Sequence, residues 1–191
     1  GSPYTEPRFV ATDKTPETAG MPTAPTRPGY TFDGYYTRIN GNGEQYYTDS
    51  GTSAHNWNIA STTTLYANWT ANIYTVTLDM QNGSGGTASV TAMYDSAMPK
   101  IEVPTRTGYI FGGYYTEPDG NGTQYYTAAG ASARRWDKLS ATTLYAKWTL
   151  NPFTVTLDRQ SGSGGAASVK VSYGNAMPDI AGPTRTGDTL G

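Results

Sequence analysis

The sequence has no cysteine, a single histidine and few charged side chains, with 15% Asp, Glu, Lys and Arg and a formal net charge of −2. Without cysteine the fold must be stabilised by packing alone, because disulfides and thiolate-bound metals are excluded. The low charge leaves no basic face of the kind that nucleic-acid binding requires. No apolar run approaches the ~18 residues that suggest a membrane span. We therefore expect neither a nucleic-acid partner nor membrane insertion of this segment.

What the sequence has in place of these features is an internal repeat with a period of 79 residues. The repeated sequence includes a Pro-Thr-Arg-x-Gly-Tyr-x-Phe-x-Gly-Tyr-Tyr-Thr motif and a Thr-Leu-Tyr-Ala-x-Trp motif. The matching segments are Pro25–Thr37 and Pro104–Thr116, Thr64–Trp69 and Thr143–Trp148, and Tyr74–Asp79 and Phe153–Asp158. A unit of this length is long enough to form a small hydrophobic core of its own. We therefore expect the chain to be a tandem array of such units.

The repeat divides the chain into four parts. These are residues 1–20, a leader or an aberrant strand; 21–70, a first copy whose first hairpin is not recognisable; 71–149, a complete second copy; and 150–191, the first half of a third copy. The joints Thr70–Ile73 and Thr149–Pro152 are short. Neighbouring repeats should therefore touch and form a semi-rigid array.

The second copy predicts a β-rich α+β fold, a small mixed sheet with at most one short helix. Apolar and polar residues alternate in Tyr74–Asp79 and again in Ala88–Tyr94, with the glycine-rich Gln81–Gly86 as the hairpin loop between them. Tyr109–Tyr115 follows as a strand in which Gly112 and Gly113 suggest a bulge. Ala128–Lys138 is the one plausible helix, and Thr143–Trp148 closes the unit as a strand.

Two interpretations of the aromatic residues remain open. In the first, Tyr109, Phe111, Trp148 and their counterparts form the core of each module. In the second, outward tyrosines form a stacking platform for a glycan or a protein partner. The candidates for this platform are Tyr35, Tyr66, Tyr114 and Tyr145.

The copies share no set of catalytic or metal-binding residues. His55 is replaced by Arg134, and Asp79 and Asp158 recur singly, so no triad or carboxylate pair is built into the unit. The Gly-Asn-Gly turns 40–43 and 119–122 offer oxygen ligands for calcium but lack the closing acidic residue. Arg27, Arg106 and Arg185 are expected to cap carbonyls or to pair with Asp79 or Asp158. We therefore expect no catalytic residues and no cofactor.

The ordered set of motifs resembles the Listeria–Bacteroides repeat, the family that includes the B repeat of the internalin surface proteins. The resemblance covers residues 21–191. It implies compact β-grasp-type modules in tandem, in secreted or envelope-anchored bacterial proteins, where they serve as spacers or in adhesion. It transfers no catalytic residue. The expected function is thus that of an extracellular, non-enzymatic spacer, and the alternative is a glycan-binding module.

The third copy also suggests self-assembly. Its half-module would expose an apolar face, made of Phe153, Val155, Leu157, Val169 and Val171. This face could complete the first copy of another molecule in a head-to-tail contact. In the alternative, residues 4–20 fold back over the first copy.

Overall fold

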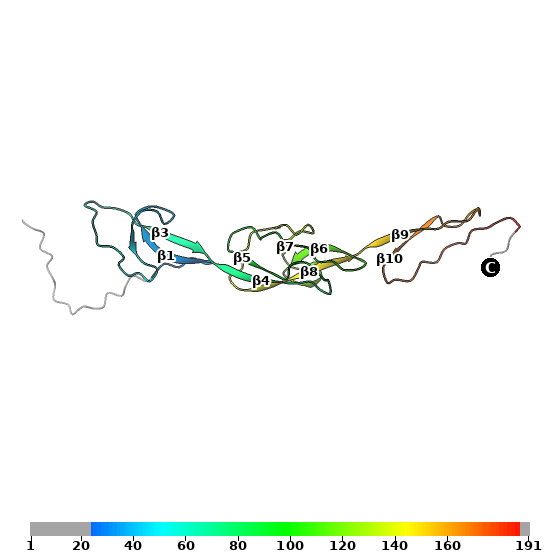
Figure 1. The fold of residues 1–191 in the computed structure, drawn as a ribbon, viewed down its shortest axis with the longest axis horizontal. Coiled ribbons are helices and arrows are strands. Elements are labelled where there is room, and N and C mark those ends of the chain that lie inside the picture. Colours follow the sequence, from blue (N-terminus) through cyan, green and yellow to red (C-terminus); the bar gives the residue numbers. More distant parts are fainter. Residues whose placement is uncertain (1–23, 188–191) are drawn as a thin grey trace, which may run out of the picture. The chain divides into compact units, whose positions relative to one another are not determined.

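The computed structural model describes residues 24–187, which form two compact units divided after Ala71 (Figure 1). The predictions for residues 1–20 fall outside the described residues. The two units are described separately below.

The first unit contains a three-stranded antiparallel sheet with the order β2-β1-β3. Its strands are β1 (Tyr30–Tyr36), β2 (Gln45–Tyr47) and β3 (Tyr66–Ala71). They correspond to the second half of the repeat, which is the half that the sequence assigned to the first copy.

The second unit begins with a five-stranded mixed sheet that holds all the strands of the second copy. They are β4 (Ile73–Asp79), β5 (Ser89–Met93), β6 (Tyr109–Tyr115), β7 (Gln124–Tyr126) and β8 (Thr142–Leu150). The order is β5-β4-β8-β6-β7, in which β4 and β8 are parallel and the other neighbours are antiparallel. The first and last strands of the repeat therefore lie side by side in the middle of the sheet.

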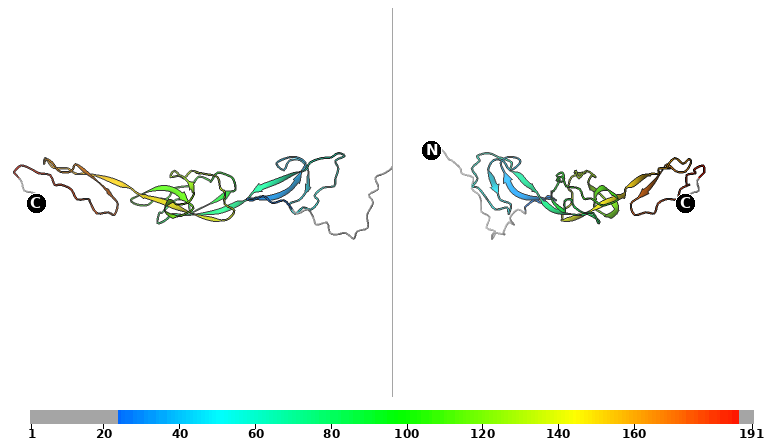
Figure 2. Two further views of the ribbon diagram at one scale, coloured as in Figure 1. Left: turned by 180° about the vertical axis from the view of Figure 1, so that it is seen from behind. Right: turned by 45° about the vertical axis from the view of Figure 1, so that its right-hand side comes forward.

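The third copy contributes one antiparallel hairpin to the second unit, β9 (Pro152–Thr156) and β10 (Ser168–Ser172) (Figure 2). As in the second copy, the hairpin loop pairs with the Pro-Thr-Arg segment. Ser163 and Thr184 exchange backbone hydrogen bonds of 2.8 Å, and Ser84 and Thr105 exchange bonds of 2.8 and 2.9 Å. The hairpin and the segment that follows it thus keep the same internal pairing in both copies.

The alternating patterns in the sequence become one buried face of the sheet. Val76 and Leu78 of β4 and Leu144 and Ala146 of β8 are all buried, while their neighbours point outward or are half-buried. The predicted bulge is confirmed, because the pairing of β6 with β8 shifts between Phe111 and Tyr114, across the two glycines. The β-rich mixed fold is therefore as expected.

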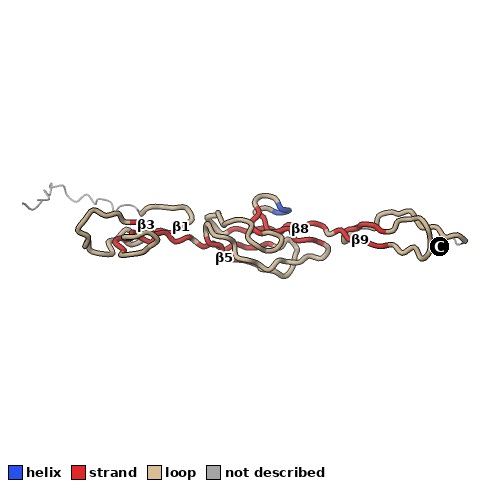
Figure 3. Tube along the Cα trace, turned by 90° about the horizontal axis from the view of Figure 1, so that it is seen from above, coloured by secondary structure: helices blue, strands red, loops and turns tan. Residues whose placement is uncertain are grey.

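The helix predicted for residues 128–138 is wrong. The one helix among residues 24–187 is a short 3₁₀ turn, Pro118–Gly120, drawn in blue in Figure 3. Gly130 has a φ of +73° and closes a turn by donating from its N–H to the carbonyl of Thr127. Trp136 then makes a parallel bridge with Tyr94 and is fully buried. Burial of this indole overrides the helix propensity of the surrounding alanine and arginine.

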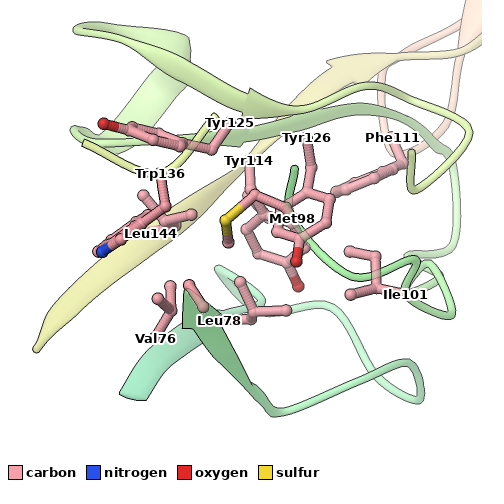
Figure 4. Packing of buried hydrophobic residues seen from close by; sticks show 12 residues of the cluster. Val76, Leu78, Met98, Ile101, Phe111, Tyr114, Tyr125, Tyr126, Trp136 and Leu144 are labelled. Carbon is pink, nitrogen blue, oxygen red and sulfur yellow. The ribbon is translucent and has the colours of Figure 1, made fainter. Parts of the chain in front are cut away.

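The core of the second copy is dominated by aromatic side chains. Its buried members are Val76, Leu78, Ala92, Met98, Ile101, Phe111, Tyr114, Tyr125, Tyr126, Trp136, Leu144 and Ala146 (Figure 4). Tyr125 packs on Trp136 with ring centroids 5.1 Å apart, and Tyr126 packs edge-on against Tyr114 at 6.2 Å. The core interpretation of the aromatics holds for Phe111, whereas Trp148 is only half-buried at the edge of this cluster.

Two buried tyrosines differ in how their hydroxyl groups are satisfied. The hydroxyl of Tyr126 donates to the carbonyl of Pro99 at 3.0 Å, whereas the buried hydroxyl of Tyr114 has no hydrogen-bond partner. An unpartnered buried polar group costs about 1–3 kcal/mol. We predict that Tyr114→Phe leaves the free energy of unfolding unchanged or increases it, while Tyr126→Phe lowers it by about 1 kcal/mol. Denaturant unfolding of both variants tests this, and a loss in Tyr114→Phe as large as that in Tyr126→Phe would contradict it.

Candidate functional site

The tyrosines proposed as a stacking platform do not share one environment. Tyr114 is fully buried in the core, so its assignment to an outward platform is wrong. Tyr35 is half-buried and packs edge-on against Phe32 at 5.2 Å, whereas Tyr66 is 42% exposed. Tyr145 is half-buried on β8, in the other unit. Of these four rings, only that of Tyr66 is exposed.

Tyr114 is buried because of the bulge that the two glycines create. The register shift places the Tyr114 side chain on the core face beside Tyr126, and burial raises the pKa of both phenols to about 12. Both are therefore protonated and neutral at physiological pH. Counting alternate residues from Tyr109 would place Tyr114 on the face opposite Tyr109 and Phe111. The shift in register is what this counting misses.

The first unit exposes two aromatic rings whose counterparts in the second copy are core residues. Trp57 is 55% exposed and Tyr47 is 39% exposed, although their counterparts Trp136 and Tyr126 are completely buried. Trp57 lies against the ring of Tyr46, with centroids 5.1 Å apart. The signal for this exposure was present in the sequence, because the first copy has no recognisable counterpart of β4 and β5.

The single histidine has a packing role. His55 is exposed and meets the ring of Tyr46 edge-on at 5.2 Å. In the second copy Arg134 stands over Tyr125, 5.4 Å from the ring centroid, and pairs with Asp137 at 2.8 Å. The two side chains thus cover equivalent tyrosines, and the replacement of His55 by arginine keeps this contact.

The recurring polar residues stabilise turns. The carboxylate of Asp79 accepts a hydrogen bond of 2.9 Å from the N–H of Gln81, and Asp158 accepts the same bond from Gln160. Arg106 donates to the carbonyl of Gln81 at 3.2 Å and stacks over Tyr109 at 3.9 Å. The carbonyl-capping role expected for Arg106 is therefore confirmed.

In the Gly-Asn-Gly turns, asparagine amides donate to nearby carbonyls. Asn42 donates from its side-chain nitrogen to the carbonyl of Ile39, and Asn121 donates to that of Pro118, each at 3.1 Å. Residues 24–187 contain no group of three or more His, Cys, Asp or Glu side chains that could hold a metal ion. The turns are thus explained by their own hydrogen bonds.

The apolar face predicted for the third copy lies on the β9–β10 hairpin. Phe153 is 44% exposed, and Val155, Leu157, Val169 and Val171 are half-buried. The hairpin also borders an open hollow of about 230 Å³. That hollow is lined by Pro152, Lys170, Val171, Ser172, Asn175, Ala176 and Pro178. No helix in the described part of the chain is long and apolar enough to cross a membrane.

Comparison with known proteins identifies the class of repeat. The sequence model of the Listeria-Bacteroides repeat domain matches residues 8–68 and 74–147, so the chain belongs to this family. The first match begins thirteen residues before Met21, within the segment 1–20 that we expected to be a leader or an aberrant strand.

The curated relatives are much longer proteins. Internalin H of Listeria monocytogenes is 35% identical over 159 residues, which is 77% of this chain and 25% of internalin H. A protein of Evansella cellulosilytica named "Putative Gly-rich membrane protein" is 33% identical over 168 residues, 85% of this chain and 19% of that protein. A second Evansella cellulosilytica relative, named "Putative membrane protein", is 29% identical over 88% of this chain and 23% of its own length. No solved structure matches the chain significantly.

Proposed function

We propose that the chain is a non-enzymatic spacer segment of an extracellular bacterial surface protein, in which repeats follow one another through very short linkers. Membership of the Listeria-Bacteroides repeat family and similarity to internalin H support a place at the cell surface. Its partners would be its neighbouring repeats and the domains that the array holds away from the envelope.

The junction between the second and third copies is the observation that carries this proposal. Asn151 alone separates β8 from β9, and its N–H donates to the carbonyl of Gly108 at 2.9 Å. Gly108 also accommodates Tyr173 of the next copy, because a Cβ at this glycine would lie 2.3 Å from the Cβ of Tyr173. A one-residue linker held by a hydrogen bond and a side-chain contact restricts bending, as a spacer requires.

The strand order supports modules of the β-grasp type. The first strand, β4, and the last strand, β8, form a parallel pair, with β5 beside β4 on one side and β6 and β7 beside β8 on the other, all in antiparallel pairing. This arrangement puts the entry and exit strands of each module side by side, with the entering and leaving chain at opposite ends of the pair. A parallel pair of this kind lets modules follow one another through very short linkers.

Glycan binding, the alternative function, has less support. Of the rings expected to form the platform, Tyr114 is buried and Tyr35 is half-buried. Tyr66 and Trp57 are among the exposed rings of the described residues that could contact a sugar. Saturable quenching of tryptophan fluorescence by a soluble glycan would favour this alternative over a purely mechanical role.

The spacer proposal predicts a narrow distribution of distances between adjacent repeats. Because the chain has no cysteine, Thr91→Cys and Lys170→Cys place two spin labels on exposed positions of the second and third copies. Pulsed electron paramagnetic resonance should give one narrow distance distribution in this background. Adding Gly108→Ala should broaden it, because the new Cβ collides with Tyr173.

The matched control for this experiment is Gly85→Ala. Gly85 also has a positive φ, of +67°, but a Cβ there would have no atom within 4 Å. This variant should keep the narrow distribution. A broad distribution in the parent background would overturn the spacer proposal, because the repeats would then move independently.

A further inference from the structure

We propose that β5 pairs antiparallel with β5 of a second copy of this chain, so that two five-stranded sheets join edge to edge. The contact links neighbouring molecules laterally, which goes beyond the spacer function proposed above. A chain that stays monomeric can still hold other domains away from the envelope. The two proposals can therefore fail separately.

The backbone of β5 uses only half of its hydrogen-bonding groups within the module. The N–H of Leu78 donates to the carbonyl of Ala88 at 2.8 Å, and the pairing of β4 with β5 continues from there without a shift in register. In an antiparallel pair such bonds involve every second residue, so the even-numbered residues of β5 are bonded to β4. The outward N–H and C=O groups, which point to the edge of the sheet, belong to Ser89, Thr91 and Met93.

This edge belongs to the second copy, in which every strand of the repeat is present. Among residues 24–187, β5 has β4 as its single neighbour in the sheet. Two backbone bonds mark the ends of the open stretch. Thr87 donates to the carbonyl of Glu102 at 3.0 Å before it, and Ser96 donates to the carbonyl of Met93 at 3.2 Å after it. The stretch between them, residues 89–93, is left for a further strand.

The opposite edge of the same sheet is covered. The chain that follows β7 folds back along it, where Tyr126 bridges Ser132 and Ala133 donates to the carbonyl of Tyr125 at 2.9 Å. Proteins that leave an edge strand open protect it with charges, proline or a bulge, because it otherwise pairs with other chains. β5 has the sequence Ser-Val-Thr-Ala-Met and a regular register, so it carries none of these.

The third copy carries such a protecting charge at the same edge position. Its strand β10 is the counterpart of β5, and Lys170 stands where β5 has Thr91. A two-fold pairing centred at this position sets the residue against its own equivalent. Like charges directly opposite each other are destabilising, whereas a threonine pair is favourable. The sequences of the two strands therefore favour self-pairing of β5 over that of β10.

The strand is also self-complementary in its hydrogen bonds. In a two-fold pairing centred on Thr91, this residue exchanges backbone bonds with its equivalent, and Ser89 exchanges bonds with Met93 of the other chain. The carbonyl of Met93 has a second lone pair for this bond. The side chains of all three residues are exposed, so the pairing leaves the core undisturbed. Because both molecules use the same surface, the contact is isologous and closes as a dimer.

Sedimentation of the parent chain and of two lysine variants tests this contact. Thr91→Lys places two charges about 5 Å apart across the two-fold axis. The matched control is Thr75→Lys, which places them about 14 Å apart, three strand spacings. Thr75 lies directly opposite Thr91 on β4 and is exposed as well. The fold tolerates lysine at position 91, because β10 carries Lys170 at the same position of the repeat.

We expect a weak contact, because a strand pair of this length covers less than the ~1,200 Å² of a typical stable interface, so concentrations up to about 1 mM are needed. The mass of the parent and of Thr75→Lys should rise from monomer toward dimer, while Thr91→Lys should stay monomeric. At the highest concentration the odd-numbered amides of β5 should exchange with solvent several-fold more slowly in the parent than in Thr91→Lys. The even-numbered amides should exchange equally in both, because they are bonded to β4 in either case.

A parent chain that remains monomeric would overturn the proposal, and this is the outcome expected if the edge receives an extended segment of a different protein. A rise in mass that persists in Thr91→Lys would also overturn it, because association would then use another surface. Slower exchange of odd-numbered and even-numbered amides alike would do the same, since it would report a stabilised module and not a strand added at its edge.

Discussion

Trp136→Ala should destabilise the second copy by about 3–5 kcal/mol. The indole is completely buried, packs on Tyr125 at 5.1 Å, and anchors the segment that the sequence predicted to be a helix. Its removal leaves a cavity the size of the largest side chain, in a module whose whole stability is about 5–10 kcal/mol. Amide hydrogen exchange is the suitable measurement, because it reports the opening free energy of β4 and β8 separately from that of β1 and β3.

The repeat supplies a matched control at the equivalent position. Trp57→Ala removes the same side chain from the first copy, where it is 55% exposed. Its expected cost is below about 1 kcal/mol, the range of surface substitutions that remove little packing. Equal costs in the two copies would show that Trp57 becomes buried in solution, by another part of the chain or by another molecule.

The contrast between Trp136 and Trp57 shows which parts of this fold the sequence could predict. The alternation of Val76 and Leu78, the glycine-rich hairpin and the closing strand are local patterns, and each leads directly to the observed element. Burial of Trp136 depends on the whole module being present, including a hairpin more than 40 residues away in the chain. Tryptophan at the same position of the repeat is therefore a core residue in one copy and an exposed ring in the other.

The two failed predictions have related causes. A run of alanine and arginine predicted a helix at residues 128–138. The turn at Gly130 and the packing of Trp136 instead determine the path of this segment, which is not helical. Tyr114 was assigned to an outward platform, but the glycine bulge turned it into the core. In both cases a local rule was overridden by a tertiary contact that no local pattern reveals.

Gly113→Ala should destabilise the second copy by at least about 3 kcal/mol. Gly113 has a φ of +114°, which side-chain-bearing residues rarely adopt, and its Cβ would lie 2.2 Å from the carbonyl oxygen of Tyr126. That carbonyl accepts a hydrogen bond of 2.9 Å from the side chain of Gln124, so it is held in place. To relieve the collision β7 must move away from β6, and Tyr126 moves with it out of the core.

The effect of geometry can be separated from that of glycine itself with Gly85→Ala. Gly85 has a φ of +67° and open space where the Cβ would be, so alanine there should cost only about 1 kcal/mol of backbone strain. Hydrogen exchange of β6 and β7 should accelerate strongly in Gly113→Ala and remain near the parent rate in Gly85→Ala. If both variants opened β6 and β7 equally, backbone strain alone would account for the loss, and the bulge would not be the feature that positions Tyr114 and Tyr126.

Gly34 occupies the same position in the first copy, with a φ of +126° and the carbonyl of Tyr47 at 2.2 Å from its Cβ position. Gly34→Ala should therefore separate β1 from β2 in the first unit, which makes the bulge a requirement of the repeat in both copies.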